Sequence, residues 1–398
     1  MMQKPVLVVF IDGLKWKSLE HMPFVNSFSC KKRIKTVLGY SITCHGAMYS
    51  GVYPNKNLLW FIWKYSPSTS PFRWAKPLKS MKVMDNLLGR YFINKTTKLF
   101  TKNSSYGGIS LLVNAPLRNW PYFDVVENKL WNEPGYLEKY PTIFDILRKQ
   151  GIEFEVVGMV RSNEGGGELK YVEKYSPSVI KPWTYLFIGD VDQYSHKFKQ
   201  HSPQTIERLR KIDRVIEEKH RLFKEKIDDF DFICFSDHGH MEVKKRVDIQ
   251  FFFKSRGKPI DRYIHLIEAT FARFWFRNKI EQEEVTSILS DFKYGYILTD
   301  EMLRKYHVNM PDNRYGDLIF YLDAPNIFSK TIWGFSLSIK SMHGYLPDYP
   351  AKDGVFVSNK AVKDVPYVHL VDIMPSIISL FGFEIPDCVD GKVLWKDD

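Results

Sequence analysis

Three short, mainly apolar runs, each followed within two residues by an acidic residue, constrain this chain more than any other feature. The runs cover residues 6–11 (VLVVFI), 184–189 (TYLFIG) and 230–235 (FDFICF). Continuous apolar runs of this length are typical of parallel strands that are buried on both faces. Because parallel strands end at the same edge of a sheet, the acids that follow them are expected to meet there. The segments that carry these acids are Asp12-Gly13, Asp190 to His196 and Ser236 to His240.

Helical segments alternate with these runs. Residues 142–150 end at a stop glycine, Gly151, and Ser202-Pro203 opens a long charged helix that reaches about residue 228. This alternation predicts an α/β fold with a mainly parallel central sheet. We expect a three-layer α/β/α sandwich, with further strands at residues 31–38, 154–159 and 354–357 and a last helix at 368–381.

Two stretches break the alternation. Residues from about 58 to 140 are rich in tryptophan, tyrosine, proline and serine, and residues 247–333 mix strand-like and helical patterns. We expect residues 1–246 and 334–398 to form a catalytic core that includes the aromatic-rich insertion, and residues 247–333 to form a smaller inserted α+β cap. Within the cap, the patterns predict strands at 249–253, 269–276 and 318–322 and helices at 281–290 and 299–306.

Composition bounds the class of protein. With 398 residues, 44% of them hydrophobic and 26% charged, the chain is typical of a large globular protein. Its four cysteines lie far apart with no CxxC pair, which argues against a disulfide framework and a thiolate zinc site. No run approaches the roughly 20 apolar residues needed to span a bilayer, and the short N-terminal run ends in an acid. These patterns predict a cytoplasmic location.

The formal net charge of +11 favours an anionic partner, but the lysines are spread along the chain. The charge could serve nucleic acid, an anionic membrane surface or a small anionic substrate, but a generally basic surface is the default interpretation, and no nucleic-acid-binding motif is visible. Residues 78–100 form a basic amphipathic segment, which predicts either a surface helix packed on its own domain or a contact with a membrane surface. The sequence makes no prediction of oligomeric state.

Three carboxylates, three imidazoles and one hydroxyl carry the candidate chemistry. Carboxylate oxygens and imidazole nitrogens are the donor set expected for two zinc-type ions. The hydroxyl comes from the segment GYSITCHGAMYSGVYP, residues 39–54, where Ser41 is favoured and Thr43 is its rival. Either hydroxyl could instead cap a helix. The candidates are Asp12, Ser41, Asp192, His196, Asp237, His238 and His343.

These motifs resemble the type I phosphodiesterase/nucleotide pyrophosphatase branch of the alkaline phosphatase superfamily. Asp12-Gly13 matches the acid after the first strand, and the segment from Ser41 to Pro54 matches the nucleophile segment without a gap. The DxxGH, SDHGM and C-terminal HG motifs match Asp192 to His196, Ser236 to His240 and His343-Gly344. The resemblance covers both ends of the chain and its middle.

The resemblance implies an alkaline-phosphatase-like fold and a phosphoesterase that splits a diester or pyrophosphate bond. By position, Asp12, Ser41, Asp237 and His238 would hold one divalent metal, and Asp192, His196 and His343 the other. Ser41 would be the nucleophile and form a phosphoseryl intermediate. The histidine-rich ligand set favours zinc, with manganese as the alternative. Cys44 occupies the position where this branch has an asparagine that binds a phosphoryl oxygen, so it is the candidate substrate contact.

Several departures leave the substrate open. Serine replaces the usual threonine nucleophile, Ser195 replaces a glycine, and Asn55-Lys56-Asn57 stands where relatives have His-Gly. The aromatic-rich insertion fits a base, a lipid or a sugar, or simply a second small core. A phosphomonoesterase, sulfatase or phosphonate hydrolase is the nearest alternative. A binding protein that keeps the fold without turnover is the alternative from another class.

Overall fold

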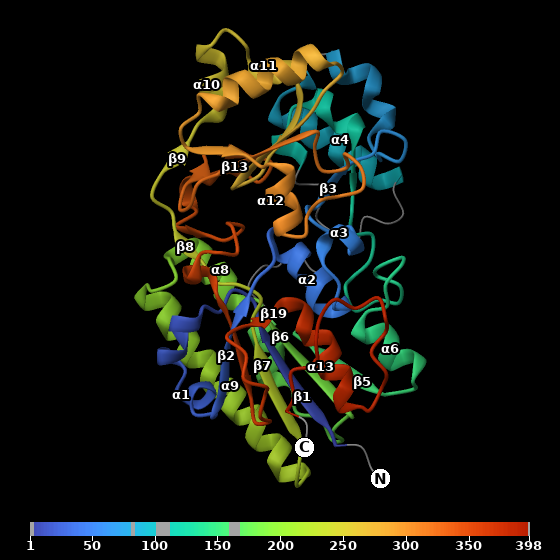
Figure 1. Ribbon diagram of the computed structural model, residues 1–398, viewed down its shortest axis with the longest axis vertical. Coiled ribbons are helices and arrows are strands. Elements are labelled where there is room, and N and C mark those ends of the chain that lie inside the picture. Colours follow the sequence, from blue (N-terminus) through green and yellow to red (C-terminus); the bar gives the residue numbers. More distant parts are fainter. Residues whose placement is uncertain (1–3, 81–83, 101–111, 159–167, 397–398) are drawn as a thin grey trace. The chain divides into compact units, whose positions relative to one another are not determined.

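The computed structural model describes residues 4–80, 84–100, 112–158 and 168–396 (Figure 1). The chain divides into two compact units. The first comprises residues 1–57, 131–242 and 340–398, and the second comprises residues 58–130 and 243–339. Among the described residues, no helix is both long enough and apolar enough to cross a membrane.

A seven-stranded sheet forms the centre of the first unit, in the order β19-β2-β18-β7-β1-β6-β5. Strands β5, β6, β1 and β7 are parallel neighbours, whereas β18 runs antiparallel to both β7 and β2. The sheet is therefore mainly parallel, as predicted. The strands are β1 (Val6–Ile11), β2 (Cys30–Lys35), β5 (Phe154–Val157), β6 (Trp183–Ile188), β7 (Asp231–Phe235), β18 (Gly354–Ser358) and β19 (Val368–His369).

Helices cover both faces of this sheet (Figure 1). Alternate residues of β1 point to opposite faces, so Phe10 lies in one hydrophobic core and Val9 in the other. The first core contains α2 (Ser41–Ser50), α6 (Ile143–Lys149) and α13 (Ile373–Leu380). The second contains α1 (Pro23–Asn26), α7 (Glu168–Lys174), α8 (Asp190–Phe198) and α9 (Pro203–Lys226). The predicted three-layer α/β/α sandwich is confirmed.

Local capping explains where two predicted helices begin. Thr142 and Asp145 form a capping box at the start of α6. The hydroxyl of Ser202 accepts a hydrogen bond from the amide of Thr205, and Pro203 occupies the first helical position of α9. The last helix is shorter than predicted, because residues 368–372 form β19 and a 3-10 turn before α13 begins at Ile373.

The second unit is built on a four-stranded antiparallel sheet in the order β10-β11-β13-β12. One face packs against α10 and α11, and the other against the aromatic-rich segment. The predicted strands at 269–276 and 318–322 and both predicted helices are present. The elements are β10 (Ile264–Ile267), β11 (Phe271–Trp275), β12 (Gly295–Ile297), β13 (Leu318–Leu322), α10 (Ile249–Ser255), α11 (Lys279–Ser290) and α12 (Asp300–Lys305).

The aromatic-rich insertion groups with the cap, whereas we expected it within the core. Its hairpin of β3 (Trp63–Tyr65) and β4 (Phe123–Val125) packs on β11. The buried guanidinium of Arg273 donates to the carbonyl of Trp63 (3.0 Å), and the rings of Phe123 and Trp275 lie 4.9 Å apart. Trp131 belongs to the first unit, where it stacks on Tyr49 at 4.6 Å, so the insertion ends at about residue 130.

The strand predicted at residues 249–253 is wrong, because these residues begin helix α10. The carboxylate of Asp248 caps this helix by accepting from the amide of Phe251 (2.9 Å). Ile249 and Phe253 are buried at helical spacing. In the basic amphipathic segment, the described helix is α4 (Leu87–Phe100), preceded by a 3-10 segment, η2 (Arg73–Ser80), and residues 81–83 lie outside the described part.

Candidate active site

The carboxyl ends of β6, β1 and β7 bring the predicted acids to one edge of the sheet. In the parallel register, Ile11 lies beside Ile188, and Phe10 lies beside Phe235. Asp12 therefore follows β1 at the level where Ser236-Asp237 follows β7. The amide of Asp192, in the first turn of α8, donates to the carbonyl of Asp12 (3.1 Å). The strand ends thus position all three acids.

Asp12, Asp237 and His238 form one group of candidate metal ligands. Their ligand atoms all lie within 4.8 Å of one another. His238 Nε2 lies 3.5 Å from Asp12 Oδ1 and 3.4 Å from Asp237 Oδ2. The other oxygen of Asp237 accepts from the amides of Gly13 (3.3 Å) and His238 (3.0 Å). Those two hydrogen bonds fix the carboxylate so that Oδ2 faces His238.

Asp192, His196 and His343 form a second group, again with ligand atoms within 4.8 Å of one another. Asp192 and His196 lie four residues apart on α8, so both side chains lie on one face of the helix. His196 Nε2 lies 3.4 Å from Asp192 Oδ1, and His343 Nε2 lies 3.6 Å from the same oxygen. The Nδ1–H of His196 donates to the carbonyl of Ser341 (2.9 Å), which leaves the Nε2 lone pair for a ligand.

The chemistry of these groups fits two divalent cations. Within the part of the chain that the structure describes, Asp237 Oδ2, both ring nitrogens of His238 and His343 Nδ1 are buried and make no hydrogen bond. Buried polar atoms without partners are costly, and a cation bound among them would remove that cost. The six carboxylate and imidazole residues group as the prediction divides them, whereas the place of Ser41 in the first set stays a prediction.

The pKa shifts at the site also favour bound cations. Burial holds the pKa of His238 and of His343 well below its ordinary value, so both rings are neutral and keep a lone pair for a metal. Burial and the nearby Asp192 carboxylate raise the pKa of Asp237 to about 7. Carboxylates crowded into a buried site favour a bound cation, which would restore their charged forms.

Ser41 and Thr43 differ in accessibility. Ser41 is the first residue of the ten-residue helix α2 and is partly exposed. Thr43 is fully buried beneath the preceding loop, and a Cβ added at Gly39 would meet its hydroxyl at 2.2 Å. The ring of Tyr40, the residue before Ser41, lies edge-on to the His343 ring, with centroids 5.7 Å apart. Accessibility thus favours Ser41 as the nucleophile.

Cys44 points into the core. Its side chain is fully buried in the cluster between β1 and α13, and its sulfur lies 3.6 Å from the hydroxyl of Thr36. Burial raises the thiol's pKa well above its ordinary value. The substrate contact expected of Cys44 therefore has no support here, because a core thiol has no access to a ligand.

His240 is a site residue that the motif analysis did not select. Its buried ring lies in the same cluster, where Nε2–H donates to Asp192 Oδ1 (2.8 Å). Asp192, His238 and His240 also offer ligand atoms that all lie within 4.8 Å of one another. The available signal was its place two residues after His238 in the loop that follows β7. The matched motif has methionine at this position, so the resemblance assigns no metal-site role to His240.

Gln200 connects the loops that carry these residues. Its buried amide donates to the carbonyl of Gly13 (3.0 Å), and its side-chain oxygen accepts from the amide of His240 (3.1 Å). One side chain from the α8–α9 loop thus holds the loop after β1 and the loop after β7 in register.

Comparison with known proteins shows the fold and a family match over part of the chain. No curated protein sequence matches this chain significantly. The human ectonucleotide pyrophosphatase/phosphodiesterase 5 structure has a TM-score of 0.67 and 13% identity, and the match covers 98% of this chain and 97% of that one. The murine protein has a TM-score of 0.68 and 13% identity, with 98% of each chain covered. Its inactive variant, solved in complex with AMP, has a TM-score of 0.67 and 12% identity, also with 98% of each chain covered.

A family match covers the middle of the chain. It begins at the first residue of β6 and includes α8, β7 and His343, but neither Asp12 nor Ser41. The resemblance inferred from the motifs is therefore confirmed: over residues 183–346 the chain matches the type I phosphodiesterase / nucleotide pyrophosphatase family of hydrolases, and as a whole it has the fold of the ectonucleotide pyrophosphatase/phosphodiesterases.

Proposed function

We propose that this protein is a two-metal hydrolase that cleaves a phosphodiester or pyrophosphate bond through a phosphoseryl intermediate on Ser41. The single observation that carries the proposal is the separation of the six carboxylate and imidazole residues into two groups at one sheet edge. A partly exposed serine begins helix α2, and the ring of the preceding residue, Tyr40, lies edge-on to the His343 ring of the second group. The family match supports the phosphodiesterase class.

Ser41 supplies the nucleophile. In the first step, its Oγ forms a bond to phosphorus while the bond from phosphorus to the leaving oxygen breaks. The serine proton passes to solvent, and the leaving oxygen gains a proton from solvent. In the second step, water attacks the phosphoserine, releases the phosphate product and regenerates the hydroxyl. When bound, the two divalent cations would lower the pKa of the attacking groups and neutralise charge on the phosphoryl oxygens.

The chain's own residues orient these steps. Ser41 is the first residue of α2, and a helix N-terminus favours an anion, so the start of this helix would favour a phosphoryl group bound there. The Asp237 carboxylate is held by two backbone amides, and the His196 ring is held by the carbonyl of Ser341. These contacts fix the ligands before substrate arrives, which lowers the cost of organising the transition state.

We propose zinc as the metal, since three of the six protein ligands besides Ser41 are histidines, with manganese as the alternative. The murine relative was solved with AMP, which supports a nucleotide or another small phosphate ester as the substrate class. A phosphomonoesterase or sulfatase would use the same ligand set, so the test must vary the substrate.

The proposal is tested with wild type and Ser41→Ala on a panel of aryl phosphodiesters, nucleoside diphosphate sugars, phosphomonoesters and sulfate esters. We expect wild type to prefer the diesters or pyrophosphates. Ser41→Ala should lose at least 100-fold in kcat, the low end of what a nucleophile or its stabilisers contribute. Retained turnover in Ser41→Ala would contradict the nucleophile. A preference for monoesters or sulfates would contradict the substrate class.

We also propose a cytoplasmic location. The support is that all four cysteines are free, with Cys44 and Cys234 buried and Cys30 and Cys388 partly exposed. Proteins of oxidising compartments more often pair such thiols. Fractionation of cells that express the full chain tests this, and recovery of the protein in the medium would contradict it.

A further inference from the structure

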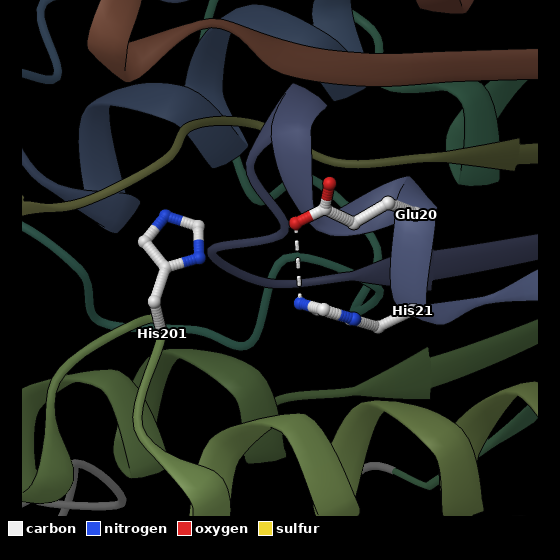
Figure 2. A group of neighbouring side chains, drawn as sticks. All are labelled: Glu20, His21 and His201. Carbon is white, nitrogen blue, oxygen red and sulfur yellow. Dashed lines mark ion pairs between the residues drawn. The ribbon is translucent and has the colours of Figure 1, made fainter.

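Glu20, His21 and His201 form a group of metal-type ligands that the proposed active site does not use (Figure 2). Glu20 and His21 end a 3-10 helix, η1 (Trp16–His21), and His201 lies in the loop between α8 and α9. Their ligand atoms all lie within 4.8 Å of one another, and His21 Nε2 lies 3.3 Å from Glu20 Oε1. Two chain segments about 180 residues apart therefore present two imidazoles and one carboxylate to a common point.

We propose that Glu20, His21 and His201 bind a third divalent cation of the zinc class, separate from the proposed catalytic pair. Two imidazole nitrogens and one carboxylate oxygen are a common ligand set for such ions, with the remaining position filled by water.

Because His201 lies in the loop between α8 and α9, an ion bound to it would stabilise that loop. His201 follows Gln200, whose amide holds Gly13 and His240, and precedes Ser202, the cap of α9. The hydroxyl of Thr205 also donates to the carbonyl of Lys199 (2.7 Å), so the loop is tied to α9 on that side. A cation would tie the opposite side of the loop to η1. It would stabilise the loop that aligns Asp12 and His240 without touching substrate.

Zinc content and thermal unfolding test this site. The full chain is equilibrated at roughly micromolar free zinc, and bound zinc is counted in wild type, His201→Asn and His307→Asn. His307→Asn is the control because it removes an exposed histidine from the second unit. We expect His201→Asn to bind one equivalent less than wild type and to lose part of the zinc-dependent rise in Tm, whereas the control keeps both.

A second background separates this ion from the catalytic pair. In Asp192→Asn, which removes a ligand of only one of the two proposed catalytic ions, adding His201→Asn should remove one further equivalent of zinc. Equal zinc content in wild type and His201→Asn would overturn the third site and leave the proposed active site standing. Loss of all zinc in Asp192→Asn would also overturn it.

A separate observation concerns the exposed face of α4. Leu87, Leu88, Tyr91 and Phe92 are 61%, 84%, 62% and 63% exposed, and they lie on one side of the helix. The opposite side carries Ile93, Asn94 and Thr97, which are buried. The helix therefore turns its larger apolar side chains away from its own core, the reverse of an ordinary surface helix.

A neighbouring hairpin extends this apolar face. Leu87 and Phe335 line one cavity of about 310 Å³, and Asn114, which follows α4, donates to the carbonyl of Ile332 (3.1 Å). In the hairpin of β15 (Lys330–Thr331) and β16 (Gly334–Phe335) and the turn after it, Trp333, Phe335 and Leu337 are 40%, 67% and 72% exposed. Contiguous exposed apolar surface of this kind marks an interaction site. We call Leu87, Leu88, Tyr91, Phe92, Trp333, Phe335 and Leu337 the apolar face.

We infer that the apolar face binds the surface of a membrane that contains anionic phospholipid. Two exposed lysines accompany the aromatic and leucine side chains: Lys95 lies on α4, and Lys330 lies 5.8 Å from the Phe335 ring centroid. Basic and aromatic side chains around an apolar helix face are complementary to anionic headgroups above acyl chains. A protein partner or a second copy of the chain would not require lysines around the apolar face, whereas anionic headgroups would.

Vesicle flotation tests the membrane surface. Wild type, Leu88→Ser/Phe92→Ser and the control Val179→Ser, which removes an exposed valine from the first unit, are mixed with vesicles of phosphatidylcholine alone or with phosphatidylserine. We expect wild type and the control to float with the anionic vesicles and the double variant to bind at least several-fold less. Equal binding by the double variant, or no binding by wild type, would overturn the inference. Self-association of wild type that the double variant lacks would assign the face to a second copy.

Discussion

The imidazole of His240 lies 2.8 Å from a carboxylate oxygen of Asp192. The same oxygen faces His196 and His343, so one acid is shared by three rings. The other ring nitrogen of His240 lies 3.4 Å from the hydroxyl of Ser341. The hydrogen bond from His240 thus orients the Asp192 carboxylate, a proposed metal ligand, as outer-shell partners of metal ligands do.

Replacing His240 is expected to weaken metal binding. His240→Ala should lower zinc affinity about 10- to 100-fold, the usual effect of losing such a partner, because the Asp192 carboxylate is then free to turn. His240→Gln, whose amide can donate to the same oxygen, should recover part of the affinity. Zinc affinity is measured by competition with a chelating dye.

The matched control is His220→Ala, which removes a buried histidine from an aromatic cluster around Phe24 and Phe232 in the same unit. It should keep wild-type zinc affinity whatever it does to stability. Wild-type affinity in His240→Ala would contradict the positioning role.

Gly39 is expected to be intolerant of a side chain. Its φ is +148°, and an added Cβ would meet the Thr43 hydroxyl at 2.2 Å. Gly151 also has a positive φ, +68°, but an added Cβ would meet nothing within 4 Å. Gly39→Ala should therefore destabilise the protein by at least about 1 kcal/mol more than Gly151→Ala, since it adds a collision to the backbone strain.

Urea unfolding of the two alanine variants measures this difference. Because Gly39 lies two residues before Ser41, Gly39→Ala should also lower kcat, whereas Gly151→Ala should not. Equal unfolding midpoints for the two variants would show that Thr43 does not pack against this loop as described.

The buried Lys352 makes stability depend on pH. Its side chain is 1% exposed, its ammonium donates to the carbonyl of Tyr345, and burial lowers its pKa from 10.5 to about 7. Between about pH 7 and pH 10.5 the unfolded chain therefore binds more protons than the folded chain. Stability is expected to rise with pH across this window, at roughly 1.4 kcal/mol for each pH unit, and the full cost is present below pH 7.

Lys352→Met removes this group and keeps its length. The variant should show a flatter dependence of stability on pH between 7 and 10 and should be more stable than wild type near pH 7, provided that the carbonyl of Tyr345 finds water. Urea unfolding at several pH values measures both effects. An unchanged slope in Lys352→Met would contradict the assignment.

Much of the fold could be predicted from local patterns. The mainly apolar runs that became β1, β6 and β7 are each followed within two residues by an acid, so both the sheet and the edge that carries the site could be predicted from them. The caps at Thr142 and Ser202 fixed the starts of two helices for the same local reason. The six candidate ligand positions could also be predicted, because their motifs resemble those of a known family.

Other features depend on contacts that no local pattern carries. The apolar residues at 249–253 suit a strand or a helix, and the helix is the form in which Ile249 and Phe253 both pack into the core of the second unit. The aromatic-rich insertion joins the cap through a buried arginine, Arg273, and the Trp63 carbonyl, which lie 210 residues apart. His240 was overlooked because its role comes from the place of Asp192 on another element.

Trapping the covalent intermediate tests the central claim most directly. Wild-type protein loaded with zinc is mixed with an aryl phosphodiester, quenched in acid within the turnover time, digested and mapped by mass spectrometry. Our account predicts a phosphate-ester adduct on Ser41, absent from Ser41→Ala and unaffected by Thr43→Ser. An adduct on Thr43, or turnover of the diester with no adduct on any residue, would contradict it.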